Sequence, residues 1–568
     1  LSAHPRSEVD GADAPTSLGR TLRIARHHLD GDDPAACGPW LFAGTRLAIR
    51  LFVPEAAEAL LQQALALPEL PDRDRRGLQA LMGELLRLRG QTEPALALLE
   101  GEVLPAMAAS HDPRYASTLT TVGVLHQIAC RYDQSLAVLG QALEAAERLG
   151  DTSTRVRCMM ATARVSYFAG DARQAADAIE RAEQAAYAAG IGPDGQPRAV
   201  PELGTILAFR GYLVGASDPS RLTDGLALIA AGAEADKAIG NSYGQFEAAT
   251  NRGNLCLSGG RVADAVQAFQ EGLDMCRRLG FALERCFAHL NLGAALLEAG
   301  DVPGALEHAE EALDWSRRQK RRFPEGFSLA LEGVCRTYLG EVPEGAAVVA
   351  EGVAVPREIE NKYLALHVAA YAAEAHVQAG RLDQALAAIA EAEAVALATG
   401  VAELDDRFAR WRLAAAVGQG APDAHAQIAA RLTALRLRPT AGSEMAHALR
   451  WRAEAQLLAG DPAGALADVA EALQLAQAGG LGLLAVELAW LAAWAAQDPV
   501  ALADARTVAH EAGHRLVEAS CDAGGVALGT LDAADVREDL GRLMASWDDA
   551  AVQAFLAIPA RRPLAALL

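Results

Sequence analysis

The stretch HLNLGAALLEAGDVPGALEHAEEAL, residues 289–313, contains two apolar segments with helical spacing, one on each side of Gly300. Its small residues include Gly293, seven positions before Gly300, and Ala305, five positions after it. Small side chains let two helix backbones approach where they cross, whereas a Leu there would push them apart. The same offsets recur in TNRGNLCLSGGRVADAVQAFQEGL, residues 250–273. The two stretches therefore predict a repeated helical hairpin.

The hairpin recurs every 40 residues along the chain. A small residue stands at the predicted turn between the two helices of each unit: Gly90, Cys130, Gly170, Gly260, Gly300, Gly340, Gly380, Gly420 and Gly460. Only the interval from Gly170 to Gly260 departs from this spacing. It contains IGPDGQPRAVP, whose Pro and Gly residues are typical of a loop. We therefore expect two repeats there, with an insertion around residues 190–220.

The second helix of each unit places apolar residues at helical spacing, as in GALEHAEEAL (304–313) and GALADVAEALQLA (464–476). A single hairpin has more apolar surface than it can bury alone, so neighbouring hairpins must stack. The sequence therefore predicts an all-α fold. We expect a right-handed superhelical α-solenoid of about ten to eleven TPR-like helical hairpins with a period near 40 residues.

The repeat pattern divides the chain into four parts. We expect an extended or disordered lead-in at residues 1–20 and helical hairpins joining it to the array at 21–82. The repeat array itself is predicted at 83–500, followed by capping helices at 501–568. Because the chain begins with Leu rather than Met, we expect it to be a part of a longer protein.

The composition narrows the classes of partner. A formal net charge of −22 argues against direct binding of nucleic acid, which rests on clustered Lys and Arg. No stretch of the sequence has the length and apolarity of a membrane span. The eight cysteines are scattered and form no CxxC pair, which is typical of reduced thiols in a cytoplasmic protein. Nearly all positive charge is Arg, which favours a bacterial source with a high G+C content.

The hairpins of residues 250–313 resemble the tetratricopeptide repeat (TPR) family, and the resemblance covers roughly residues 83–500. The period of 40 differs from the family's 34, and most aromatic consensus positions hold Ala, Leu or Cys. Longer hairpins of this kind are similar to the sensor arrays of bacterial STAND-type signal-transduction ATPases, such as LuxR/MalT-like or cyclase-associated regulators. Residues 22–67 and 548–564 are similar to the segments that join and close such arrays.

This resemblance implies an array that binds a protein, a peptide or a small-molecule effector and restrains an attached nucleotide-binding module. The chain itself has no P-loop, because Asp236, Gln319 and Asn361 precede its three lysines where Gly would be required. We therefore expect neither an enzyme nor a cofactor, and a homo-oligomer stays open. One alternative is a freestanding TPR adaptor in protein–protein assembly, and a second is a zinc hydrolase.

The inner groove, formed by the first helices, is the predicted ligand site. The TPR resemblance places polar candidates there from four consecutive units: Glu247, Asn254, Ser258, Glu298, Tyr338, His367, Glu374 and Gln378. The set is mixed polar and partly acidic, which suits a peptide or a basic segment. The carboxamide of Asn254 could bond to the backbone amides of such a peptide. The alternative is that these side chains are merely solvated.

The zinc alternative rests on His510-Glu511-Ala512-Gly513-His514, which matches H-E-x-x-H. On one helix this spacing places two imidazoles on the same face, where they can hold zinc while Glu511 activates water. Glu518, Asp522 or Glu538 could supply a third ligand. The other interpretation is a chance match on a solenoid helix, because a metalloprotease also needs a substrate-aligning strand, and the following residues show little strand pattern.

A dense basic run follows the end of a predicted second helix. It comprises Arg317, Arg318, Lys320, Arg321 and Arg322. Cations at a helix C-terminus interact favourably with the helix dipole, so a solvated helix end explains the run. The alternative is a docking patch for an acidic partner or a phosphate.

Overall fold

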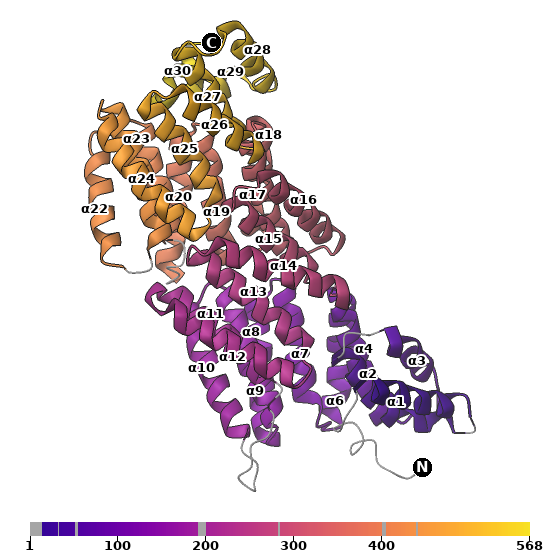
Figure 1. The fold of residues 1–568 in the computed structure, drawn as a ribbon. Coiled ribbons are helices and arrows are strands. Elements are labelled where there is room, and N and C mark those ends of the chain that lie inside the picture. The colour runs from indigo at the N-terminus through magenta and orange to yellow at the C-terminus, as the bar shows by residue number, and fades with distance from the viewer. Residues whose placement is uncertain are drawn as a thin grey trace.

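The computed structural model describes residues 14–31, 33–50, 55–190, 200, 202–281, 284–399, 405–438 and 441–568. All regular structure in these residues is helical, and consecutive helices pack as hairpins, which confirms the predicted all-α solenoid (Figure 1). None of the described helices combines the length and apolarity that crossing a bilayer requires.

Helices of the array alternate between an inner and an outer layer. The first helices of the hairpins are α4 (Asp72–Leu88), α7 (Tyr115–Ile128), α9 (Thr152–Phe168), α11 (Leu203–Ser217), α13 (Ser242–Ser258), α15 (Arg285–Glu298), α17 (Arg322–Tyr338), α19 (Lys362–Gln378), α21 (Asp405–Gly418), α23 (Gly442–Leu458), α25 (Gly482–Ala496) and α27 (Arg515–Ala527). The second helices are α5 (Thr92–Leu98) continued by α6 (Leu104–Ala109), α8 (Tyr132–Leu149), α10 (Ala172–Ala189), α12 (Leu222–Ala238), α14 (Val262–Leu279), α16 (Val302–Arg318), α18 (Val342–Glu358), α20 (Leu382–Thr399), α22 (Ala424–Arg436), α24 (Pro462–Gly479), α26 (Pro499–Glu511) and α28 (Ala533–Leu543).

The chain ends carry further helices. Helices α1 (Ala14–Leu29), α2 (Gly38–Arg50) and α3 (Glu55–Leu65) precede the array, and α29 (Asp549–Leu556) and α30 (Arg562–Ala565) follow it. Helix α1 begins inside the segment predicted as a lead-in, because Leu18 and Leu22 are buried in an apolar cluster shared with α2, α3 and α4. Residues 1–13 of that predicted segment lie outside the described residues.

The predicted hairpin turns adopt one backbone conformation. All nine predicted turn residues have positive φ, from 60° at Cys130 to 86° at Gly170 and Gly340. This left-handed conformation ends a helix and favours glycine, since other residues meet their own backbone there. The irregular interval holds the hairpin of α11 and α12, whose turn at 218–221 has no left-handed glycine. Of the insertion expected around residues 190–220, residues 191–199 and 201 lie outside the described residues, and helix α11 occupies 203–217.

The superhelix winds tightly enough for one turn of it to touch the next. The backbone N–H of Val302 donates to the carbonyl of Ala512 (3.2 Å), and the indole N–H of Trp547 donates to the carbonyl of Gly340 (2.9 Å). Arg561 Nη2 donates to the carbonyl of Gln378, 183 positions earlier (2.9 Å). We call these contacts the seam. The seam brings the C-terminal helices over α15, α17 and α19, as Figure 1 shows near the top of the molecule.

Candidate ligand-binding cavity

The first helices line a large, partly open cavity of ≈ 1920 Å³. Its wall runs from α2 and α4 through each first helix to α23. Pockets for drug-sized ligands hold about 300–1,000 Å³. The cavity is therefore large enough for an extended molecule that contacts many repeats at once.

One position of the repeat faces the cavity in five consecutive units. Residues 40 positions apart occupy it: Glu247, Phe287, Phe327, His367 and Arg407. Burial, and next the charge of Arg407, lowers the pKa of His367 to about 3, so the imidazole is neutral. Its Nε2 atom is buried and has no hydrogen-bond partner.

Aromatic side chains cover much of the wall. They are Phe42, Tyr132, Tyr167, Phe168, Phe209, Tyr212, Tyr243, Phe246, Phe287, Phe323, Phe327, Tyr363 and Tyr371. The Tyr167 hydroxyl lies 2.6 Å from that of Tyr212 and 3.0 Å from that of Tyr363, so this cluster joins α9, α11 and α19 across the interior. Asn361 strengthens the link, since its Nδ2 donates to the Tyr132 hydroxyl (2.8 Å). The aromatic faces offer apolar contact area to a bound ligand.

The wall is nearly balanced in charge although the chain is strongly acidic. Its arginines are Arg46, Arg73, Arg87, Arg114, Arg157, Arg164, Arg321, Arg407, Arg410 and Arg438, and its acids are Asp74, Glu84, Asp151, Glu202, Glu247, Glu284, Glu298, Asp406 and Glu444. Many are paired across neighbouring helices. Arg410 Nη2 donates to Glu444 (2.9 Å), and Arg438 Nη2 to Asp406 (2.6 Å). Paired guanidiniums of this kind hold the wall in a fixed geometry.

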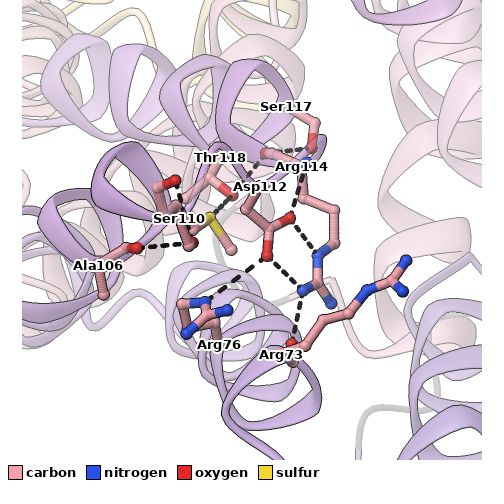
Figure 2. A network of polar contacts seen from close by, with 9 residues as sticks. Arg73, Arg76, Ala106, Ser110, Asp112, Arg114, Ser117 and Thr118 are labelled. Carbon is pink, nitrogen blue, oxygen red and sulfur yellow. Dashed lines mark hydrogen bonds and ion pairs between the residues drawn. The ribbon is translucent and has the colours of Figure 1, made fainter.

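An arginine and aspartate network joins α4 to the start of α7, where Arg73 and Arg114 line the cavity (Figure 2). Asp112 is buried and accepts hydrogen bonds from Arg114 Nε (2.8 Å) and Nη2 (2.6 Å). Arg76 lies 3.7 Å away on α4. Burial opposes the charge of Asp112, but the bonds from Arg114 outweigh it and lower the pKa of this carboxyl. In Figure 2 the side chain of Arg73 extends away from this network, and it also lines the cavity.

The structure places five of the eight predicted groove residues on the cavity wall. These are Glu247, Asn254, Ser258, Glu298 and His367. Each comes from a first helix, as the repeat pattern predicts. Whether they bind a ligand remains a prediction.

The other three predicted groove residues lie elsewhere. Tyr338, Glu374 and Gln378 are buried, and the Tyr338 hydroxyl donates to Glu374 Oε1 (3.0 Å). Gln378 Nε2 donates to Glu487 Oε1 of α25 (3.2 Å), and Tyr338 packs edge-on against His514. The reason is the seam, because the next superhelical turn covers the C-terminal ends of α17 and α19.

Two wall residues were not among the predicted candidates. Asn251 of α13 and Asn291 of α15 line the cavity at equivalent positions of consecutive repeats, 40 residues apart. Together with Asn254, they present carboxamides that form no hydrogen bond to any described residue. The recurrence of Asn at one repeat position is the sequence signal that could have identified them.

The HEAGH segment does not form the geometry that zinc binding requires. Helix α26 ends at Glu511, Gly513 turns the chain with φ 73°, and His514 caps α27. The His510 side chain is 63% exposed and lies 3.2 Å from Glu518 Oε1, whereas His514 is fully buried. The two imidazoles therefore do not share a helix face, and the geometry on which the zinc alternative depends is not formed. Among the described residues, no group of three or more His, Cys, Asp or Glu could hold a metal ion.

The basic run is divided among several environments. Arg317 lies 2.9 Å from Glu351, Arg318 lies 2.6 Å from Asp314, and Arg322 lies 2.8 Å from Glu325. Arg321 turns into the cavity, 5.0 Å from the ring centroid of Phe287, and Lys320 occupies the left-handed turn. The run therefore does not form one uniform patch, and its docking role stays a prediction.

Neither the known family models nor the curated proteins match this sequence. Solved structures that resemble it include the Cut9–Hcn1 assembly of the APC/C (TM-score 0.43, 11% identity, covering 92% of this chain and 99% of that one). A Rap protein complexed with competence and sporulation factor also matches (TM-score 0.43, 12% identity, covering 68% and 99%). A STAND protein with a TPR sensor from Pyrococcus horikoshii matches at TM-score 0.29 and 13% identity, covering 71% and 56%. These likenesses are too distant to bear on function.

Proposed function

We propose that the chain is the ligand-binding sensor region of a bacterial regulatory protein, and that an extended peptide occupies its cavity. The observation that carries this proposal is the ≈ 1920 Å³ cavity lined by aromatic rings and by carboxamides that form no hydrogen bond to any described residue. The aromatic rings supply apolar contact area that does not require one particular side chain on the bound peptide.

The carboxamides favour a peptide over an apolar small molecule. An Asn side chain both donates and accepts hydrogen bonds, so it matches a peptide group in either direction. Asn251 and Asn254 lie one helical turn apart on α13, and Asn291 follows on α15. A bound backbone that runs along the wall would meet one amide after another.

The sensor role rests on the way the superhelix is built. Most contacts of a repeat are with its neighbours, and the seam and the tyrosine cluster join more distant repeats, so the winding can change where those contacts open. A peptide that contacts many first helices would bind one winding better than another and shift the population toward it. An attached module would read that shift as a change in the position of the array's ends.

Selection of a random-peptide library on the protein tests the proposal. We expect enriched peptides whose affinity, measured by fluorescence polarisation of synthetic copies, falls about tenfold or more in the double variant Asn251→Ala/Asn291→Ala. Each lost peptide hydrogen bond costs about 1 kcal/mol, and tenfold in affinity corresponds to about 1.4 kcal/mol.

The matched control removes two carboxamides from the outside of the array. Gln267 and Gln270 are exposed on α14, so Gln267→Ala/Gln270→Ala should bind the same peptides with unchanged affinity. Failure to enrich any peptide, or equal affinity for all three proteins, would contradict a peptide site in the cavity.

A further inference from the structure

Six aromatic side chains form one continuous patch on the cavity wall. We call this patch the aromatic platform, and its members are Phe168 of α9, Phe287 of α15, Phe323 and Phe327 of α17, and Tyr363 and His367 of α19. The ring centroid of Phe323 lies 5.4 Å from that of Phe327, 5.5 Å from that of Phe168 and 6.1 Å from that of Phe287. The His367 ring extends the patch, 5.1 Å from Phe327 and 4.4 Å from Tyr363. Rings from four first helices therefore share one surface.

Much of the platform is accessible from the cavity. Four of its rings are partly exposed and line the cavity, namely Phe168, Phe287, Phe327 and His367. The other two, Phe323 and Tyr363, are buried and pack against them. Burial, and next the charge of Arg407, lowers the pKa of His367 to about 3, so the platform carries no charge at neutral pH. Apolar surface that stays accessible in a concave wall is typical of a ligand site.

An arginine stacks on a ring at each border of the platform. The guanidinium carbon of Arg321 lies 5.0 Å from the ring centroid of Phe287. On the other side, that of Arg407 lies 4.3 Å from the ring centroid of Tyr371 of α19, and Arg407 Nη2 also donates to Glu374 Oε2 (3.0 Å). Both arginines line the cavity. A guanidinium attracts the negative face of an aromatic ring, whereas an aliphatic side chain has no such face, so the borders favour an aromatic occupant.

We propose that the aromatic platform is a subsite for one aromatic side chain of the bound peptide, that of a Phe, Tyr or Trp residue. The inference rests on the proposed peptide function and adds the chemical class of one ligand residue. The ring of the ligand would pack against Phe287, Phe327 and His367, the accessible rings of the consecutive first helices α15, α17 and α19. Aromatic pairs in offset or edge-to-face contact are more favourable than their buried area alone would give. The platform should therefore distinguish an aromatic ring from a saturated one.

Positional-scanning decapeptide libraries, acetylated and amidated to remove terminal charges, provide the test. At each position in turn the fixed residue is Phe or its saturated analogue cyclohexylalanine, which is similar in size but has no π face. Peptides retained by the protein are quantified by mass spectrometry. We expect one position at which Phe is retained about two- to tenfold better than cyclohexylalanine.

Phe327→Leu is the decisive variant, because it removes a ring of the platform and keeps an apolar side chain. It should remove most of the preference for Phe while still retaining peptides with cyclohexylalanine at that position. Phe287→Leu should act in the same direction, whereas His367→Phe, which keeps a ring, should keep the preference. Tyr187→Leu is the matched control and should leave the preference unchanged, since Tyr187 is 52% exposed on the second helix α10. Thermal unfolding of each variant checks that it is folded.

Equal retention of Phe and cyclohexylalanine at every position by the wild-type protein would overturn the aromatic subsite while leaving peptide binding intact. A Phe preference that survives in both Phe327→Leu and Phe287→Leu would also overturn it. If no decapeptide is retained at all, the peptide function fails, and the subsite is then decided by thermal shift. Millimolar N-acetyl-phenylalaninamide should raise the unfolding temperature of the wild type more than that of Phe327→Leu, and more than N-acetyl-cyclohexylalaninamide does. No rise in the wild type would overturn the subsite as well.

Discussion

Asp236 is a fully buried carboxylate at the end of α12, at the junction with α11 and α13. Asn241 Nδ2 donates to its Oδ1 (2.8 Å), while Oδ2 is buried without a partner. Gly204 and Gly244 leave room for it, because a Cβ at Gly244 would lie 2.1 Å from Oδ2. Burial raises the pKa of Asp236 to about 6, although the bond from Asn241 opposes the rise.

Replacing this carboxylate should therefore stabilise the protein at high pH alone. The folded pKa lies above the ordinary value of 3.8, so the carboxyl favours folding below pH 4 and this advantage is lost as pH rises through 6. At pH 8, Asp236→Asn should raise the free energy of unfolding by about 2–3 kcal/mol, at 1.36 kcal/mol per pKa unit. Thermal unfolding at pH 4 and pH 8 measures this, with exposed Asp274→Asn as control. A gain of equal size at both pH values would refute it.

At the same scale, the sequence predicts which residues share a repeat position but not what covers them. Ser258, Glu298, Tyr338 and Gln378 stand 40 residues apart, and only the first two reach the cavity. The others are buried by α25 and α27, through contacts such as Gln378 with Glu487. The period of the repeat and the position of a residue within it are local properties that composition and spacing reveal. The seam depends instead on the superhelical pitch, which accumulates over several repeats.

Between elements, the hairpins are held by close backbone crossings at small residues. A Cβ at Gly293 would lie 3.1 Å from the carbonyl oxygen of Ala305, which is the pair that the sequence pattern singles out. The crossing of α11 with α12 is closer, since a Cβ at Gly225 would lie 2.5 Å from the carbonyl oxygen of Gly211. Gly225→Ala must push these helices apart.

We expect Gly225→Ala to lower the free energy of unfolding by about 1–3 kcal/mol, the usual cost of overpacking. Gly140→Ala on α8 is the matched control, because no atom lies within 4 Å of the added methyl group. It should instead stabilise the protein by up to about 1 kcal/mol through helix propensity. Thermal unfolding of the two variants measures both effects. If the unfolding temperatures of both variants shift in the same direction, the close crossing of α11 and α12 does not determine the stability of this hairpin.

At the scale of the whole molecule, two turn glycines allow the effect of the seam on stability to be measured apart from the effect of the turn conformation. Gly380 and Gly460 hold equivalent positions with φ 77° and 81°, so Ala carries the same left-handed strain of about 1–2 kcal/mol at either one. Only Gly380 touches another superhelical turn, since a Cβ there would lie 2.2 Å from the carbonyl oxygen of Ala554, whereas Gly460 has nothing within 4 Å.

Gly380→Ala should therefore open the seam, and Gly460→Ala should not. The extra clash adds about 1–3 kcal/mol to the shared strain and strains the adjoining bond from Arg561 to the Gln378 carbonyl. We expect small-angle X-ray scattering to give a larger radius of gyration for Gly380→Ala than for Gly460→Ala, together with a lower unfolding temperature. If the two variants have the same radius and the same unfolding temperature, the seam contributes nothing to the winding of the superhelix, and the aromatic cluster that joins α9, α11 and α19 holds it instead.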